Sequence, residues 1–230
     1  MPSHLPLFPL GVVLYPGAVV PLHIFEPRYR QLVIDCVSED DRFGMCPPAE
    51  GRGAPAIGAI GCLAEIVERE TLSDGRSNLL VLGRERFRIM RLVEEGTPYY
   101  LGDVDLFDDD PATLPDAGTM RALKDLAGQY IELARLLTEE PLRELPFDDD
   151  AVVATFEIAA MLEVDFQLRQ RMLVMRDTGE RAALLLDMLP QILPQLAAAL
   201  AVRRRARSNG TDATDPDPDA ERSDDDAATA

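Results

Sequence analysis

Residues 5–33 read LPLFPLGVVLYPGAVVPLHIFEPRYRQLV, and this stretch decides the fold of the first half of the chain. It is apolar enough to form buried strands, yet five prolines interrupt it. Because proline lacks a backbone N–H, it is tolerated at sheet edges, strand starts and turns. A Pro-Gly turn separates an irregular connection, VVLY, from a strand, AVVPLHIF, so the segments can wrap around a small closed sheet. The prolines are Pro6, Pro9, Pro16, Pro21 and Pro27.

A helix and a hairpin follow. Pro27 suits a first helical turn, and apolar residues recur at helical spacing after it, which predicts a helix over 27–38. Residues 58–72 and 78–93 then form two long strands joined at an Asp-Gly hairpin tip. The apolar pattern of the second strand changes parity between Arg88 and Met90, which predicts a bulge or barrel corner there. One more strand lies within PYYLGDVDLFDDD, which starts at Pro98.

After residue 115 the apolar period becomes helical. One stripe of apolar side chains predicts a long helix that includes Met120 and Leu137. Carboxylates that suit a first helical turn precede three more predicted helices, which begin after Asp150, Asp165 and Asp177.

The strand-like and helical spacings of apolar residues divide the chain into a β-rich subdomain at residues 1–115 and a helical bundle at 116–207. Together they predict an α+β fold. Residues 208–230 hold eight carboxylates and one arginine, show no apolar period and are predicted to form a disordered acidic tail. For this tail, a solubilising role is favoured over an autoinhibitory one.

The net charge is −18, of which −11 falls outside the tail, so phosphate backbones and anionic membranes would be repelled. The charge disfavours nucleic acid and membranes as partners.

Cysteine and histidine usage indicates neither a metal site nor a disulfide. Cys36, Cys46 and Cys62 have no C-x-x-C spacing, and His4 and His23 are not arranged with them as ligands, so we expect buried, reduced thiols. The N-terminus lacks a signal-peptide pattern, and no later stretch has the continuous run of ~18 apolar residues that a membrane span needs. The sequence predicts a cytoplasmic protein without a cofactor.

Catalytic motifs are missing from the sequence. Lys124 is the single lysine and does not lie in a G-K-[ST] loop, which excludes a P-loop ATPase. A serine–lysine dyad could use only Lys124, on the exposed side of a predicted helix, and there is no G-x-S-x-G elbow. His23 could act as a base, but a strand histidine held by hydrogen bonds is favoured. Adjacent acids at 108–110 and 148–150 favour turn and capping roles over a weak divalent-cation site.

The opening stretch closely resembles the start of the N-terminal substrate-binding domain of Lon proteases. Three later segments resemble the same domain in order and spacing. They are GRERFRI from Gly83, PYYLGDVDL from Pro98, and LRQRMLVMRDTGERAALLLDML from Leu168. The resemblance covers about residues 4–203, and the long opening motif is its most specific part.

The resemblance implies a PUA-like β-pseudobarrel with one helix, followed by a helical bundle. In Lon proteases this domain precedes an ATPase and a serine–lysine protease and helps to select substrates. We therefore expect a non-catalytic protein- or peptide-binding module, and more finely an adaptor or modulator of proteolysis. Its expected partners are unfolded or partly folded polypeptides and a protease or chaperone. The alternative is a small-molecule or anion-binding regulator that uses a pocket of the barrel, and a hydrolase with an unrecognised site is a third reading.

Recognition of unfolded segments needs accessible apolar and aromatic side chains, sometimes beside a sheet edge that pairs with the bound backbone. The structural alternative is that Phe25 and Tyr29 pack the first helix onto the barrel while Glu26 and Arg28 orient it. The candidate substrate-binding residues are Tyr15, Phe25, Glu26, Arg28, Tyr29, Arg86, Tyr99 and Tyr100.

Overall fold

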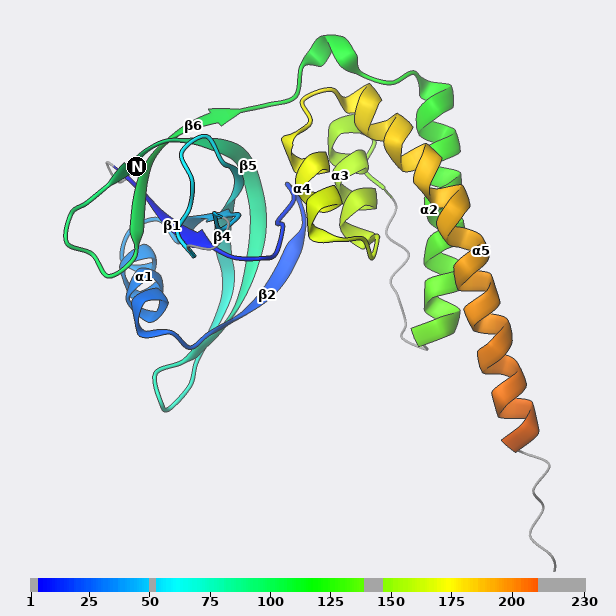
Figure 1. Ribbon diagram of the computed structural model, residues 1–230, viewed down its shortest axis with the longest axis horizontal. Coiled ribbons are helices and arrows are strands. Elements are labelled where there is room, and N and C mark those ends of the chain that lie inside the picture. Colours follow the sequence, from blue (N-terminus) through cyan, green and yellow to red (C-terminus); the bar gives the residue numbers. More distant parts are fainter. Residues whose placement is uncertain (1–3, 50–52, 139–146, 211–230) are drawn as a thin grey trace, which may run out of the picture.

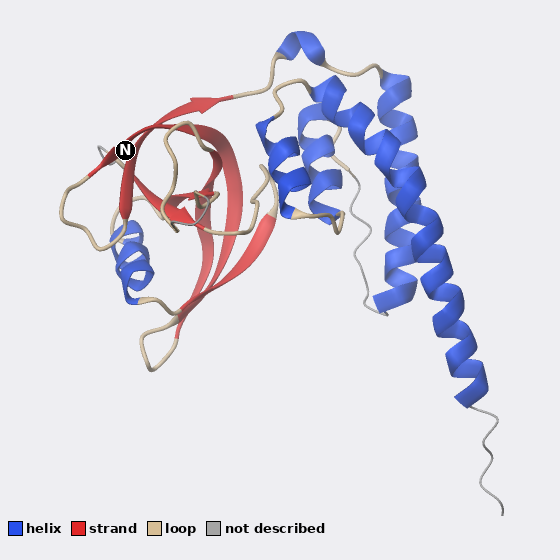
Figure 2. Cartoon of the chain, in the orientation of Figure 1, coloured by secondary structure: helices blue, strands red, loops and turns tan. Residues whose placement is uncertain are grey.

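The computed structural model describes residues 4–49, 53–138 and 147–210. Figures 1 and 2 show two parts, a sheet that curls around itself and a group of helices beside it. The first part holds β1 (Leu5–Pro9), β2 (Val19–Ile24), α1 (Pro27–Val37), β3 (Arg42–Cys46), β4 (Ile60–Thr71), β5 (Ser77–Val93) and β6 (Tyr100–Phe107). The second part holds α2 (Ala117–Thr138), α3 (Ala151–Met161), α4 (Phe166–Val174) and α5 (Thr178–Gly210). The fold is α+β, as the sequence predicted.

The sheet closes into a barrel because its longest strand pairs with different neighbours along its length. The strand order is β2-β5-β4-β3-β1-β6, and β5 also pairs with β6. The β1–β3 pair is parallel, and the other pairs are antiparallel. Residues 77–82 of β5 pair with β2, whereas residues 86–93 pair with β6. In the part of the chain that the structure describes, β2 pairs only with β5 and leaves its other edge open.

The predicted hairpin and bulge are both confirmed. β4 and β5 pair along the hairpin, and Gly75 at its tip has a φ of 81°, which glycine adopts without a steric penalty. The β5–β6 register shifts between Ile89 and Arg91, where the sequence predicted a change of buried face. Met90 stays 54% exposed within this bulge, while Leu92 is half-buried.

The predicted first helix is confirmed by α1, which starts at Pro27 and ends at Val37. Its buried side chains share one core with the inward side chains of β2 and β5. Figure 1 shows α1 on the side of the barrel away from α2 and α5. The buried side chains of α1 are Tyr29, Leu32, Val33 and Cys36.

The predicted helices after residue 115 are confirmed, and an aspartate caps each of the four, with Asp116 at the start of α2. The Asp150 carboxylate accepts hydrogen bonds from the backbone N–H groups of Val152 (2.7 Å) and Val153 (3.2 Å). Asp165 and Asp177 accept equivalent bonds at the starts of α4 and α5. Such caps satisfy backbone donors that have no partner within the helix and contribute about 1 kcal/mol each. α2 and α5 pack side by side, with α3 against α5 (Figure 1).

Helix α5 differs from the sequence expectation in two ways. It ends at Gly210 and so includes the first three residues that were predicted to be tail. The rest of that tail, residues 211–230, lies outside the described residues. The sequence has no continuous apolar run of the length that a membrane span needs, yet residues 178–206 of α5 are long and apolar enough on average to cross a membrane, by length and composition only. Polar residues interrupt the apolar run of α5, so a search for continuous runs does not find it, but its mean hydropathy over a window remains high. One such helix is weak evidence for a membrane span.

All three thiols are free and buried, as the sequence predicted. Burial raises the pKa of Cys36, Cys46 and Cys62 from 9.0 to about 12 in each case, and carboxylates near Cys36 add to the effect. The folded protein therefore keeps three protons that the unfolded chain releases between about pH 9 and pH 12.

This difference predicts a loss of stability in alkali. The contribution is fully present below about pH 9 and is lost as the pH rises toward 12, at about 1.4 kcal/mol per pH unit for each thiol. Urea unfolding at a series of pH values, with thiolate absorbance of the folded protein as the second readout, checks this. Thiolate absorbance in the folded protein near pH 9 would contradict it.

Candidate functional site

An apolar surface lies on the outside of the barrel where β2 joins β5. The sequence of β5 includes LLVL at residues 79–82, which is apolar on both faces of the strand. The inward residues Leu79 and Val81 are buried in the core, whereas Leu80 and Leu82 lie on the outer face and are only partly covered. A strand that is apolar on both faces is normally covered on both. On the outer face of β5, by contrast, Leu80 and Leu82 are not fully covered by other residues.

The pairing of β2 with β5 extends this surface. Val19 lies opposite Leu82, Pro21 opposite Leu80, and His23 opposite Asn78. Alternate residues of a strand share a face, so these six side chains form one outward surface, with Val19 55% exposed. We call it the β2–β5 face: Val19, Pro21, His23, Asn78, Leu80 and Leu82.

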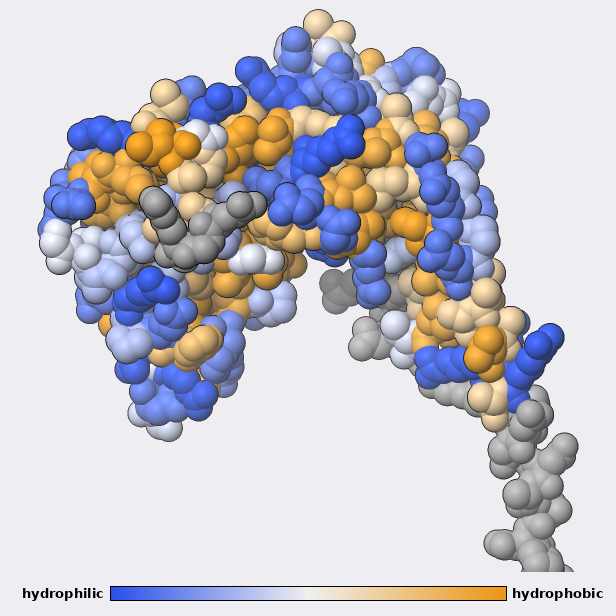
Figure 3. Space-filling model, viewed as in Figure 1, coloured by the Kyte–Doolittle hydropathy of each residue, from blue (hydrophilic) through white to orange (hydrophobic). Residues whose placement is uncertain are grey.

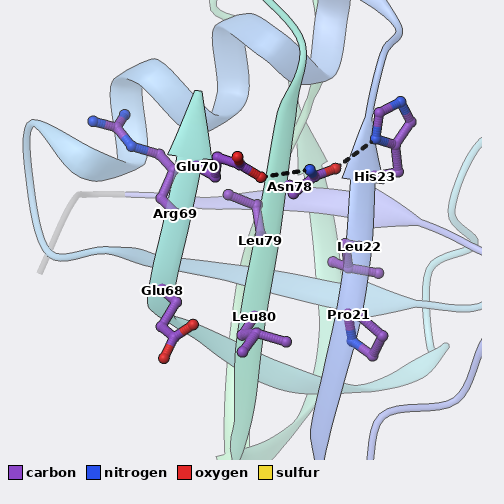
Figure 4. Close-up of a pocket in the computed structure, with 9 residues that line it drawn as sticks. All are labelled: Pro21, Leu22, His23, Glu68, Arg69, Glu70, Asn78, Leu79 and Leu80. Carbon is purple, nitrogen blue, oxygen red and sulfur yellow. Dashed lines mark hydrogen bonds between the residues drawn. The ribbon is translucent and has the colours of Figure 1, made fainter. Parts of the chain in front are cut away.

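A hollow of about 590 Å³ lies over the tip of the β2–β5 face and the adjoining end of β4. Figure 4 shows Pro21 and Leu80 side by side on this surface, while Arg69 points away from them. We call it the edge hollow, because β2 is the open edge of the sheet. Its lining residues are Pro21, Leu22, His23, Glu68, Arg69, Glu70, Asn78, Leu79 and Leu80.

A chain of hydrogen bonds crosses the three strands at one end of the edge hollow (Figure 4). His23 Nδ1 lies 2.7 Å from Asn78 Oδ1, and Asn78 Nδ2 donates to Glu70 Oε2 at 2.8 Å. Arg76 Nη1 lies 3.5 Å from His23 Nε2. Because Asn78 Oδ1 can only accept, His23 Nδ1 is the donor in the first of these contacts. His23 is thus held by hydrogen bonds, in line with the favoured structural reading over a catalytic base.

A second hollow, of about 680 Å³, lies where the barrel meets the helical part. β5 lines both hollows, and the nine residues from Asn78 to Arg86 span about 27 Å of strand. That is the length of about eight residues of an extended peptide. We call it the junction hollow; its lining residues are Pro16, Gly17, Leu82, Gly83, Arg84, Glu85, Arg86, Phe107, Asp108, Asp109, Pro111, Leu114, Asp150, Val152, Val153 and Phe156.

A buried ionic cluster forms the base of the junction hollow. Arg86 from β5 and Arg181 from α5 each donate to one oxygen of Asp109, which follows β6. The side chains are 3%, 0% and 4% exposed for Arg86, Arg181 and Asp109. Thr178 Oγ1 also donates to Asp109, at 2.6 Å. We call Arg86, Asp109 and Arg181 the junction cluster; it ties the barrel to the helices.

The junction cluster has one carboxylate for two guanidiniums, and the remaining positive charge meets other partners. Arg86 Nη1 donates to the carbonyls of Leu173 (2.9 Å) and Met175 (2.6 Å), and Arg181 Nη1 donates to Met175 (3.1 Å). These carbonyls end α4, where the helix dipole is negative. Arg181 Cζ also lies 3.8 Å from the centre of the Phe156 ring. Burial lowers the pKa of Arg86 from its usual value, and Asp109 opposes this effect.

The structure separates the sequence-predicted site residues into buried and accessible ones. Tyr15, Tyr29, Arg86 and Tyr99 are all buried, so the expectation that they present accessible side chains is wrong. The hydroxyl of Tyr15 donates to the carbonyl of Arg169 across the junction of the two parts, at 3.0 Å. Tyr99 donates to Asp35 of α1 at 2.7 Å, and Arg86 belongs to the junction cluster. These four residues hold elements together.

The other four predicted residues do not form one surface. Phe25 is 60% exposed, and its ring centre lies 6.2 Å from that of His23, so it borders the β2–β5 face. Glu26 and Arg28 form an ion pair at the start of α1, 2.9 Å apart. Tyr100 is half-buried and packs against a small buried cluster formed by Leu7, Cys46, Phe87 and Ile89.

The hydroxyl of Tyr29, in α1, is buried and gives a testable prediction about stability. Burial raises the pKa of its hydroxyl to about 12, and the hydroxyl has no hydrogen-bond partner among the described residues. An unsatisfied buried hydroxyl costs about 1–3 kcal/mol. Tyr29→Phe is therefore expected to leave the free energy of unfolding unchanged or raise it by about 1 kcal/mol, measured by urea unfolding.

Tyr15→Phe is the matched control, because the Tyr15 hydroxyl does have a partner. Its loss should cost about 1 kcal/mol. A clear destabilisation by Tyr29→Phe, equal to that by Tyr15→Phe, would show that the Tyr29 hydroxyl is satisfied.

Sequence reasoning missed the residues that make the β2–β5 face accessible and apolar. Leu80, Leu82 and Val19 were not singled out, although LLVL carried a usable signal: its outward residues are leucines where a half-exposed strand would have polar ones. Glu68 and Glu70 were also missed. Among residues 4–49, 53–138 and 147–210, no group of three or more histidines, cysteines or acids could hold a metal ion.

Comparison with known proteins gives one consistent family. The model of the ATP-dependent protease La (LON) substrate-binding domain matches residues 4–191. Lon protease 2 of Myxococcus xanthus is 30% identical over 206 residues, which cover 82% of this chain and 24% of that protein. Lon protease of Escherichia coli (strain K12) is 25% identical over 213 residues, which cover 88% of this chain and 26% of that protein. The chain thus spans about a quarter of the length of these relatives.

Solved structures give the same fold. The crystal structure of a Lon N-terminal domain protein from Xanthomonas campestris superposes with a TM-score of 0.60 at 28% identity, and covers 80% of this chain and 98% of that one. The N-terminal domain of Mycobacterium avium complex Lon protease superposes with a TM-score of 0.63 at 16% identity, and covers 82% of this chain and 98% of that one. The second match supports the fold alone.

Proposed function

Because the chain belongs to the family of substrate-binding domains of ATP-dependent Lon (La) proteases, we propose that it recognises polypeptide segments and binds them in extended form on the β2–β5 face. The observation that carries this proposal is the partly exposed apolar outer face of LLVL beside an open strand edge. An extended segment can pair its backbone with a free strand edge and place alternate side chains on the neighbouring surface.

The edge of β2 suits this mode of binding. An unpaired strand edge presents N–H and C=O groups that attract other strands, and proline on an edge limits unwanted pairing. Pro21 lies in the middle of β2, where it removes one donor but leaves its side chain on the apolar surface. The edge is therefore available to a bound segment along only part of its length, which favours short, reversible contacts.

Leu80→Asp tests this proposal. The substitution places a carboxylate in the middle of the apolar face, and we expect the affinity for a fluorescent, permanently unfolded protein to fall roughly tenfold or more in anisotropy titrations. The control is Met90→Asp, a change on the same strand at a residue that is already exposed and lies outside both hollows. Equal affinities of the Leu80→Asp and wild-type proteins would rule out the β2–β5 face.

The finer part of the proposal is that the protein is a non-catalytic, cytoplasmic adaptor or modulator of proteolysis. The residues 1–115 would carry the binding surface, the residues 116–207 would support it, and the acidic tail from 208 would aid solubility. Support comes from the family match and from the lack of a P-loop or serine–lysine motif in this sequence. Addition of the protein to a Lon-family protease should change the rate at which an unfolded reporter is degraded, with no cleavage by the protein alone.

A second candidate function is favoured by the junction hollow. Hollows between two parts of a protein that combine apolar walls with a few charged groups are common small-molecule sites. Here Phe107, Phe156 and Val152 supply apolar walls next to the junction cluster. A small-molecule regulator bound there should raise the melting temperature by mass action in a metabolite screen. A hit that is lost on Val152→Asp would favour this candidate.

A further inference from the structure

Arginines and carboxylates line both hollows, but the two kinds of charge along the β2–β5 face are not equally available to a ligand. Arg84 lies on the same strand, but its guanidinium binds both oxygens of Glu65, at 2.8 and 2.9 Å. Arg86 is buried in the junction cluster. Arg69 alternates with Glu68 and Glu70 and lies opposite Leu79, an inward residue, so its side chain leaves from the other face of β4. The three arginines that line the hollows are therefore paired, buried or turned away.

Three carboxylates beside the same surface are left without a partner. In the described part of the chain, Glu68 in the edge hollow and Glu85 and Asp108 in the junction hollow form no hydrogen bond or ion pair through their side chains, and all three are exposed. The other three lining carboxylates are engaged: Glu70 accepts from Asn78, Asp109 belongs to the junction cluster, and Asp150 caps α3. Among the residues that line the two hollows, the unpaired charge is therefore negative at both ends. Arg176 lies next to the junction hollow but does not line it, and its Nε donates to the Asp108 carbonyl at 3.1 Å.

The spacing of these carboxylates suits an extended ligand. Glu68 pairs with Leu80 across the β4–β5 ladder, and Glu85 follows five residues later on β5. Five residues of strand span about 17 Å, which is also the length of about five residues of a bound extended chain. Leucines at 80 and 82 form the apolar floor between the two ends.

From this charge pattern we propose that the segment bound on the β2–β5 face is a basic–apolar–basic one: an apolar stretch of about five residues flanked by lysine or arginine. The proposal rests on the proposed function and adds the class of segment. Apolar side chains would face Pro21, Leu80 and Leu82, while the flanking cations would lie near Glu68 at one end and near Glu85 and Asp108 at the other. Acidic segments would be rejected by the same carboxylates.

Three fluorescent peptides test the proposal, each with the same alternating valine and leucine centre. Their flanks are lysine, glutamine or glutamate, and their affinities are measured by anisotropy at low and high salt. We expect the lysine-flanked peptide to bind about tenfold more tightly than the glutamine-flanked one, and to lose this advantage at high salt, because exposed charge pairs are screened.

Two triple variants locate the effect. Glu68→Gln, Glu85→Gln and Asp108→Asn together should bring the lysine-flanked peptide to the affinity of the glutamine-flanked one. Glu39→Gln, Asp125→Asn and Glu163→Gln remove the same net charge from exposed sites outside both hollows, and should leave the preference intact. Thermal unfolding of both variants confirms that they are folded.

The outcomes separate the two proposals. If all three peptides bind equally, or if the control variant loses the preference as fully as the site variant, the basic–apolar–basic proposal is overturned while polypeptide binding stands. If none of the peptides binds and the permanently unfolded protein does not bind either, the proposed function itself fails.

Discussion

Asp109→Asn is expected to lower the free energy of unfolding by about 3–5 kcal/mol, the largest effect of any single polar substitution considered for this chain. The carboxylate is the only acid that pairs with the two guanidiniums of the junction cluster among the described residues. Without it, Arg86 and Arg181 stay buried with carbonyl partners but no counter-charge. Equilibrium urea unfolding, followed by circular dichroism, measures the change.

Asp108→Asn is the matched control for this prediction. The neighbouring residue has the same side chain, but it is exposed and its carboxylate holds no partner in the described structure. Its replacement should change the stability by less than about 0.5 kcal/mol. If Asp109→Asn were as mild as Asp108→Asn, the junction cluster would not hold the two parts of the molecule together.

Phe156→Ala is the second substitution with a large expected effect, a loss of about 3–5 kcal/mol. The ring is 1% exposed, lies 3.8 Å from Arg181 Cζ, and packs against the ring of Tyr15 with 5.7 Å between centres. Its loss removes buried apolar surface and leaves the Arg181 guanidinium beside a cavity. The same urea unfolding experiment checks it.

Phe25→Ala provides the contrast, because this phenylalanine is 60% exposed. We expect a change in stability below about 0.5 kcal/mol, together with weaker polypeptide binding if Phe25 extends the β2–β5 face. A loss of stability similar to that of Phe156→Ala would mean that the Phe25 ring is packed rather than accessible.

The elements of this fold were predictable because their signals are local. Pro27 and the helical spacing after it specified α1, and the Asp-Gly pair specified the β4–β5 hairpin. Helix caps at Asp150, Asp165 and Asp177 depend on residues only two or three positions away. Each of these signals needs no knowledge of the rest of the chain.

The candidate site was harder to predict because burial depends on contacts that are distant in sequence. Arg86 alternates with Phe87 and so read as an outward residue, but the register shift of β5 against β4 before it and the helices that cover it bury its side chain. Tyr15 is buried by a contact with Arg169, more than 150 residues away. No local pattern marks either contact.

The same limit explains why the β2–β5 face was missed. LLVL signals a strand that is apolar on both faces, but the sequence does not show which face remains uncovered. In the structure, Leu79 and Val81 belong to the core that α1 shares, whereas Leu80 and Leu82 are only partly buried. The helices stand beside the barrel, and hydrophobic residues are visible on the surface of both parts (Figures 1 and 3). Which face of a strand stays accessible therefore depends on contacts that are distant in sequence.

The most direct measurement is a map of backbone amide chemical shifts as the full-length protein is titrated with a permanently unfolded polypeptide. If the β2–β5 face is the binding surface, the shifts will concentrate in β2 and in residues 78–84 of β5, and Leu80→Asp will abolish them. Shifts confined to α2 and α5, with β2 unchanged, would contradict the assignment of polypeptide recognition to the barrel edge.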